Sequence, residues 1–304
     1  MKIAVVGSYG VGLTMWVPRA PAPGETVSDG AFREEPGGKG SNQAVAAARL
    51  GAEVSLLTAV GDDDFARTAR RLWGAEGVDA THVVTTDAHT MTGFILVEPS
   101  GENRIAIAPG ALNHLTAEHV EDFREVIAAA DILVVSMEIP EAVVLAALRV
   151  GREAGTATLL NPAPARPLPD DAWRLIDVIT PNQTEAPVLL GRAGEPDADA
   201  EELVAELRDR TGGSAVLTLG GRGALVAGPR GVTRVPARPV DRVIDTTGAG
   251  DAFTAALAVA LASGRDVPSG VEFAAAAGAR AVTVAGVIPA LPTRDRLPDL
   301  FPIG

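Results

Sequence analysis

The sequence has 304 residues, of which 47% are hydrophobic and 21% are charged, a balance typical of a globular protein with a large core. The formal net charge is −13 and no basic stripe is present, so the composition argues against binding to a nucleic-acid backbone. The absence of cysteine excludes disulfides, thiol catalysis and cysteine metal sites.

The N-terminal stretch MKIAVVGSYG begins like a buried strand and lacks the basic region and long apolar run of a signal peptide. Elsewhere no apolar run approaches the roughly 20 residues of a membrane helix without glycine or charge interrupting it. We therefore expect a cytoplasmic protein without a membrane partner.

The first half of the chain predicts strands of two kinds. Some are continuous and apolar, as in a buried sheet, whereas others are short and separated by turns. Buried strands are expected at 2–6 and 54–60, helices at 42–50 and 62–77, and short strands at 25–35, 81–86, 92–97 and 104–108. We expect the short strands to form a small accessory sheet.

From residue 116 onward, apolar strands alternate regularly with helices. Helices are expected at 116–130, 140–155, 198–210, 249–263 and 269–284, strands at 131–137, 156–161, 175–182 and 214–221, a hairpin at 223–235 and a surface tail from Pro289. Such alternation predicts a parallel sheet covered on both faces. The expected fold is therefore an α/β three-layer sandwich with a mostly parallel central sheet and a small β lid.

Polar or glycine residues follow several of these strands at the same edge of the predicted sheet. They are Glu138, Asn161, Asn182, Glu185 and the glycines of 220–223. Ligands of open α/β sheets bind outside the carboxyl ends of the strands. The recurrence of such residues at one edge favours a binding site there.

The stretch DTTGAGDAF at 245–253 combines a glycine-rich turn with the start of an alanine-rich helix. Free N–H groups and the positive end of the helix dipole suit an anion at Gly248, Ala249 and Gly250. Asp251 places a carboxylate beside that anion site. Together these groups suit transfer of a phosphoryl group to a hydroxyl.

Four motifs occur in a fixed order: GGKGSNQAVAAARLGA near the N-terminus, TPNQTEA at 180–186, TLGGRGAL at 218–225 and DTTGAGDAF at 245–253. Over essentially the whole chain this resembles the PfkB carbohydrate kinase family, and within it the ribokinases. NPAPA at 161–165 and PAPGET at 21–26 also fit that group. The resemblance implies one ribokinase-like domain over 1–304, a lid from about 9–35 and 90–108, and a homodimer formed through the lid.

The resemblance also implies a kinase that uses ATP, Mg²⁺ and a monovalent cation such as K⁺ to phosphorylate a primary hydroxyl of a ribose-like sugar. Asp251 looks like the base, and the backbone of Gly248, Ala249 and Gly250 looks like the anion hole. The remaining positions resemble sugar contacts (Gly38, Lys39, Asn42, Glu138, with Asp251), nucleotide contacts (Asn182, Thr218, Gly220, Gly223), a water-mediated Mg²⁺ residue (Glu185, with Asn182) and a monovalent cation loop (Asp245, Thr247, Ala281, Val284, Gly286).

The chain departs from the ribokinase pattern after the first strand. Gly10 and Gly12 stand where ribokinases usually carry a sugar-binding Asn and Asp. We expect a roomier pocket there, for a bulkier or differently hydroxylated substrate. Tyr9, Met15 and Trp16 are near, and an aromatic ring among them either stacks on the substrate or packs in the core.

A second departure is FAAAAGARA at 273–281, which has only Ala where ribokinases often place a polar residue near adenine. Three functions stay open: a ribokinase-type sugar kinase, a nucleoside kinase of the same fold, and a non-catalytic protein that binds a sugar or nucleotide. Asp251 argues against the last of these, because a pure binder has no need of a base.

Overall fold

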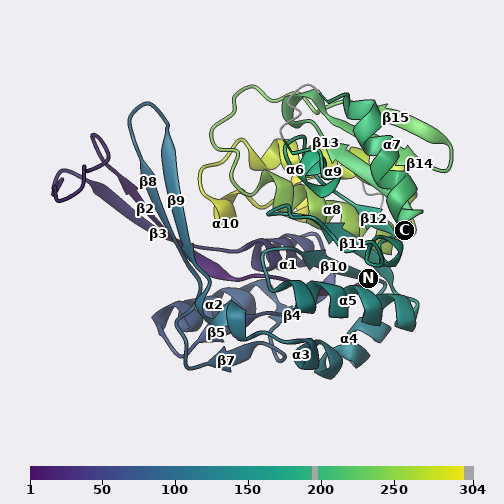
Figure 1. Cartoon of the computed structure of the whole chain (residues 1–304), viewed down its shortest axis with the longest axis horizontal. Helices are drawn as coiled ribbons and strands as arrows, with labels where there is room; N and C mark the ends of the chain where they lie inside the picture. Colours follow the sequence, from purple (N-terminus) through teal and green to yellow (C-terminus); the bar gives the residue numbers. More distant parts are fainter. Residues whose placement is uncertain (194–197, 298–304) are drawn as a thin grey trace.

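The computed structural model describes residues 1–193 and 198–297, and its centre is a nine-stranded sheet with the order β15-β14-β13-β12-β11-β10-β1-β4-β6 (Figure 1). Its strands are β1 (Lys2–Val6), β4 (Glu53–Leu57), β6 (Val78–Asp79), β10 (Ile132–Ser136), β11 (Ala157–Asn161), β12 (Val178–Ile179), β13 (Ser214–Thr218), β14 (Ala224–Gly228) and β15 (Gly231–Val235). Pairing is parallel from β6 to β13 and antiparallel from β13 through β14 to β15. The mostly parallel sheet predicted from the sequence is confirmed.

Helices cover both faces of this sheet because successive side chains of each strand point to opposite sides. In β1, Ile3 and Val5 join one hydrophobic cluster, whereas Ala4 and Val6 join the other. The first cluster includes α1 (Lys39–Arg49), α2 (Asp64–Glu76), α8 (Ala249–Ala262) and α9 (Val267–Ala281). The second includes α3 (Ala117–Asp122), α4 (Arg124–Ala129), α5 (Glu141–Ala154), α6 (Glu185–Leu189) and α7 (Ala200–Thr211). The predicted three layers are therefore present.

A separate four-stranded sheet projects from this body, with the order β3-β2-β8-β9 (Figure 1). Its strands are β2 (Gly10–Trp16), β3 (Ala31–Gly37), β8 (Thr92–Val97) and β9 (Asn103–Ala108). We call it the small sheet. The segments predicted at 92–97 and 104–108 pair here, while the segment predicted from residue 25 becomes a strand only at Ala31.

Two predictions about the strands near this sheet are wrong. The segment 54–60 is not one strand, because β4 ends at Leu57 and β5 (Ala59–Gly61) leaves the large sheet. The segment 81–86 does not join the small sheet, since β7 (Val84–Thr86) pairs with β5 in a two-stranded sheet of its own. Short apolar segments do not by themselves identify their partner strand.

The predicted helix at 116–130 is interrupted at Phe123, whose buried side chain lies between α3 and α4. The expected surface tail from Pro289 is also wrong, because Ala290, at the end of the short helix α10 (Val287–Ala290), and Leu291 and Leu297 after it are buried in the first cluster. The rest of that tail, 298–304, lies outside the described residues. Among the helices that the structure describes, none has the length and apolarity needed to cross a bilayer.

Candidate active site

Two cavities meet at the turn of Gly248, Ala249 and Gly250. The larger has a volume of about 520 Å³ and is lined by the small sheet, the start of α1 and Gly248. The smaller has a volume of about 290 Å³ and is lined by the end of β13, part of α9, and Ala249 and Gly250. The turn is therefore a wall that both cavities share.

Gly248 lets this turn begin α8. Its φ of 77° lies in the left-handed region that glycine adopts most readily, and a Cβ there would stand 2.9 Å from Val287 Cγ1. The first N–H groups of a helix have no partner within it, and the dipole makes that end positive. The shared wall is therefore suited to an anion lying between the two cavities.

Asp251 lines the larger cavity from the first turn of α8, and only 8% of its surface is exposed. Asn42 Nδ2 donates to Asp251 Oδ2 at 2.8 Å, and Gln43 Nε2 donates to Asp251 Oδ1 at 3.0 Å. Burial raises the pKa of the Asp251 carboxyl, while Lys39 and the two amide donors oppose that rise. Gln43 did not figure among the predicted site residues, although it follows Asn42 directly in the GGKGSNQ motif.

Lys39 begins α1 amid several carboxylates. Burial disfavours its charged form, but Asp251, Glu138 and Glu185 outweigh that penalty and raise the pKa of the ammonium. Glu138, which follows β10, accepts hydrogen bonds from the Ser8 hydroxyl and, at 3.3 Å, from the Lys39 backbone N–H. The structure thus brings the five predicted sugar contacts to one cavity. Ser8, which the sequence did not point to, does not line the cavity but donates a hydrogen bond to Glu138.

The position of α1 depends on close backbone contact with the loop after β1. A Cβ on Gly40 would lie 2.6 Å from Gly7 Cα, and one on Gly38, whose φ is 88°, would lie 2.6 Å from Tyr9 Cα. Real Cβ atoms do not approach other atoms so closely. The glycines of GGKG therefore allow the helix that carries Lys39 and Asn42 to pack directly on this loop.

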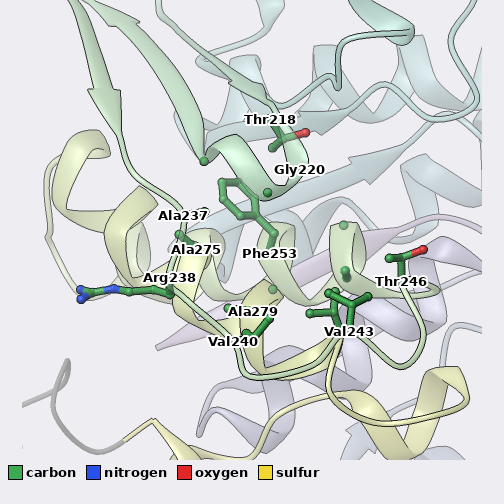
Figure 2. Close-up of a pocket in the computed structure, with 16 residues that line it drawn as sticks. Thr218, Gly220, Ala237, Arg238, Val240, Val243, Thr246, Phe253, Ala275 and Ala279 are labelled. Carbon is green, nitrogen blue, oxygen red and sulfur yellow. The ribbon is translucent and has the colours of Figure 1, made fainter.

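The smaller cavity is lined by Thr218, Gly220 and Gly223, three of the four predicted nucleotide contacts, which lie at and after the end of β13 (Figure 2). Its other walls are mostly apolar. They comprise Gly221, Ala237, Arg238, Val240, Val243, Thr246, Phe253, Ala275, Gly278, Ala279 and Val282. Figure 2 shows Phe253 directed toward the Gly220 turn and Arg238 extending away from it. Two alanines of FAAAAGARA, Ala275 and Ala279, thus line this cavity. Phe253 belongs to the DTTGAGDAF motif but was not among the predicted site residues, and no motif indicated the 237–243 segment.

Asn182 lies outside the lining of both cavities. Its Oδ1 accepts hydrogen bonds from Thr184 N, Thr184 Oγ1 and Glu185 N, at 2.8, 2.8 and 2.9 Å. Glu185 Oε2 in turn accepts from Asn182 N at 2.8 Å, and burial raises the pKa of this carboxyl. Over residues 1–193 and 198–297, no three His, Asp or Glu side chains are grouped so as to hold a metal directly.

The segments predicted to hold a monovalent cation do lie together. Asp245 Oδ2 accepts from Gly286 N at 3.0 Å, and Asp245 Oδ1 accepts from Thr247 Oγ1 at 2.6 Å. Burial alone would raise the pKa of Asp245, but these hydrogen bonds and the charge of Arg33 lower it overall. Asp245, Thr247 and Gly286 line the larger cavity, whereas Ala281 and Val284 line neither cavity.

The expectation of extra room at Gly10 is wrong. A Cβ on Gly10 would meet Met91 Cε at 2.4 Å and the Met91 carbonyl oxygen at 2.9 Å, so Met91 already fills that space. A Cβ on Gly12 would lie 3.4 Å from Ile95 Cδ1, which is ordinary contact. A substrate therefore finds no empty volume behind Gly10.

The three side chains expected near the substrate have different surroundings. Tyr9 is fully buried in edge contact with Trp73, with ring centroids 5.1 Å apart, so it is a core residue. Trp16 lines the outer part of the larger cavity beneath the Arg33 guanidinium, which lies 5.1 Å from its ring. Met15 does not line the cavity, because neighbouring residues of β2 point to opposite faces.

The chain is similar to known carbohydrate kinases over almost its whole length. A family model described as pfkB family carbohydrate kinase matches residues 2–294. A ribokinase of Haemophilus influenzae is 37% identical, and the match covers 96% of each chain. A deoxyribokinase of Salmonella typhi is 34% identical, with 97% of each chain covered. A structure of Arabidopsis thaliana ribokinase complexed with ribose and ATP has a TM-score of 0.91 at 29% identity, covering 98% of this chain and 97% of the other.

Proposed function

Because the chain belongs to the pfkB family of carbohydrate kinases, we propose that it transfers the γ-phosphoryl group of ATP to a primary hydroxyl of a ribose-like sugar. The observation that most supports this proposal is the turn of Gly248, Ala249 and Gly250, shared by two cavities. ATP would occupy the smaller cavity and the sugar the larger one, so that the γ-phosphate meets the hydroxyl at the turn.

In this proposal Asp251 is the base. The hydroxyl oxygen bonds to the γ-phosphorus while its proton passes to the Asp251 carboxylate, and the bond to the bridging oxygen of ADP breaks. The N–H groups at the start of α8 stabilise the charge on the transferred group, because they already point at its position. Lys39, Asn42 and Glu138 orient the acceptor, since sugar hydroxyls both donate and accept hydrogen bonds.

Glu185 and Asn182 would order Mg²⁺ through water molecules. The residues fit such a role, because Glu185 is a partly buried carboxylate close enough to Lys39 and Asp251 for their charges to act on it. Magnesium keeps several waters and needs only one or two carboxylates beside the phosphates. When bound with ATP, the ion neutralises charge on the phosphates. Asn182 contributes through the loop that its Oδ1 holds in place.

The small sheet and the Asp245–Gly286 loop have proposed roles in assembly and in ion binding. The small sheet would be a lid on the larger cavity and the contact of a homodimer, because five of its large hydrophobic side chains are exposed: Trp16, Phe32, Phe94, Ile105 and Ile107. The Asp245–Gly286 loop would hold K⁺ with the carbonyls of Ala281 and Val284. We also propose that residues 1–304 form one domain. The protein would act in the cytoplasm, where ATP is available.

The test is release of ADP from ATP and Mg²⁺, with and without K⁺, in the presence of a panel of pentoses and nucleosides. Turnover of a pentose supports the proposal, and turnover of nucleosides alone would assign the chain to nucleoside kinases. ATP binding without turnover on any acceptor would support the non-catalytic alternative instead. Sedimentation of the same preparation reports whether it is a dimer.

A further inference from the structure

The sugar side of the larger cavity has two chemically different walls. One is polar and comes from α1, β10 and α8, through Lys39, Asn42, Glu138 and Asp251. The facing wall comes from the inner part of the small sheet. Its lining residues are Gly10, Gly12, Met91, Gly93 and Ile95. Gly10, Gly12 and Gly93 have no side chain, and the side chains of Met91 and Ile95 offer no strong hydrogen-bonding group, so this wall is poorly suited to binding hydroxyls.

Polar groups of the small sheet begin only at the outer end of this apolar wall. Thr14 pairs with Ile95 there, and Thr14 and Trp16 are both farther out than Gly12 along β2, which projects from the body (Figure 1). Glu35 pairs with Gly12 across the strands, but its carboxylate turns aside. Glu35 Oε1 lies 2.6 Å from the position of a Cβ on Gly286 and 3.5 Å from Arg33 Nη1. The carboxylate of Glu35 therefore faces the Asp245–Gly286 loop and not the space in front of Gly12.

The apolar wall has a consequence for the acceptor. A hydroxyl held against Met91 and Ile95 loses its hydrogen bonds to water and gains none from these side chains. A hydrogen atom at the same carbon loses nothing and buries apolar surface. Sequence identity does not separate the two cases, because the ribokinase and deoxyribokinase relatives are 37% and 34% identical.

Resting on the sugar kinase function above, we propose that the acceptor is a deoxy sugar, with hydrogen in place of a hydroxyl on the edge that faces β2. Gly12 and Ile95 are the specificity-determining residues at this edge, and Met91 closes the space behind Gly10. The primary hydroxyl that receives the phosphoryl group stays on the polar side, near Asp251.

The experiment compares kcat/KM for D-ribose, 2-deoxy-D-ribose and 3-deoxy-D-ribose with ATP and Mg²⁺. All three keep the primary hydroxyl, so only the edge of the sugar changes. We expect at least one deoxy sugar to exceed ribose by 10-fold or more, since an unpaired buried hydroxyl typically costs about 10-fold to 100-fold. Ribose as good as both deoxy sugars would overturn this inference and leave the kinase proposal standing, whereas no turnover on any sugar would overturn both.

A matched pair of variants tests the wall itself. Gly12→Asp adds a carboxylate to the apolar wall and is expected to shift the ratio toward ribose by at least 10-fold. Gly12→Ala adds the same Cβ, 3.4 Å from Ile95 Cδ1, but no carboxylate that could accept a hydrogen bond from a hydroxyl. This variant should therefore keep the preference for the deoxy sugar. An equal shift in both variants, or no shift in Gly12→Asp, would contradict the assignment of Gly12 and Ile95.

Discussion

The side-chain amide of Gln43 is 3.0 Å from Asp251 Oδ1 and 3.0 Å from Asn161 Oδ1, so one nitrogen bonds to both residues. Asn161 ends β11, and its Nδ2 reaches the Thr180 carbonyl at 3.4 Å. Gln43 thereby connects the proposed base on α8 to the carboxyl edge of the large sheet. Its Oε1 is buried without a hydrogen-bond partner among the described residues, so positioning of Asp251 depends on the donor side of the amide.

Replacing Gln43 with Leu removes this donor at similar volume. We expect kcat to fall about 10-fold, because a general base works only when its geometry is held. The Gln43 hydrogen bond lowers the pKa of Asp251, so its loss should also move the acidic limb of the pH–rate profile to higher pH. A lower kcat with an unmoved acidic limb would indicate only a structural role.

Asp251→Asn should lower kcat by about 10²–10⁴-fold, the usual contribution of a general base. The affinity for ATP should change little, because Asp251 lines the other cavity. Steady-state rates and calorimetric titration with ATP measure the two quantities separately. Wild-type kcat in this variant would show that the base is elsewhere.

Replacing two charged neighbours of Asp251, Lys39 and Glu138, should move the acidic limb of the pH profile of kcat/KM in opposite directions. Its raised pKa places the acidic limb above the ordinary aspartate value of about 3.9. Activity falls as the pH decreases through that pKa, because the base must be ionised. Lys39→Met removes a charge that lowers this pKa and should move the limb to higher pH, whereas Glu138→Gln should move it to lower pH. Shifts of the same sign would contradict the assignment of the limb to Asp251.

Gly40→Ala should destabilise the protein by about 1–3 kcal/mol, since its Cβ would lie 2.6 Å from Gly7 backbone atoms and force α1 away. Gly74→Ala is the matched control in α2, where a Cβ meets nothing within 4 Å. This variant should instead raise the free energy of unfolding by about 0.5–1 kcal/mol, because alanine has a higher helix propensity than glycine. Denaturant unfolding of both variants gives the two free energies. Equal changes in the free energy of unfolding of the two variants would show that Gly40 and Gly7 are not in tight contact.

The sequence predicted the parallel sheet, both helical layers and many of the motif residues that line the two cavities, because period and motif are local properties. It did not predict that the chain leaves the large sheet after Leu57, since partner choice depends on segments far away. Gln43 and Ser8 were missed for a related reason. Their function depends on Asp251 and Glu138, which are 208 and 130 residues distant and become neighbours only on folding.

Met91 packs against Gly10, and this packing restricts the order in which substitutions can accumulate in the pocket. A side chain longer than hydrogen at position 10 meets both the flexible end of Met91 and its carbonyl oxygen. An Asn at position 10 therefore requires both a smaller residue 91 and a backbone shift that withdraws the carbonyl oxygen of residue 91, so substitutions at the two positions are coupled rather than additive. A lineage moving from this pocket to one that binds a fully hydroxylated sugar would shorten residue 91 first. Position 12 is free to change at any step.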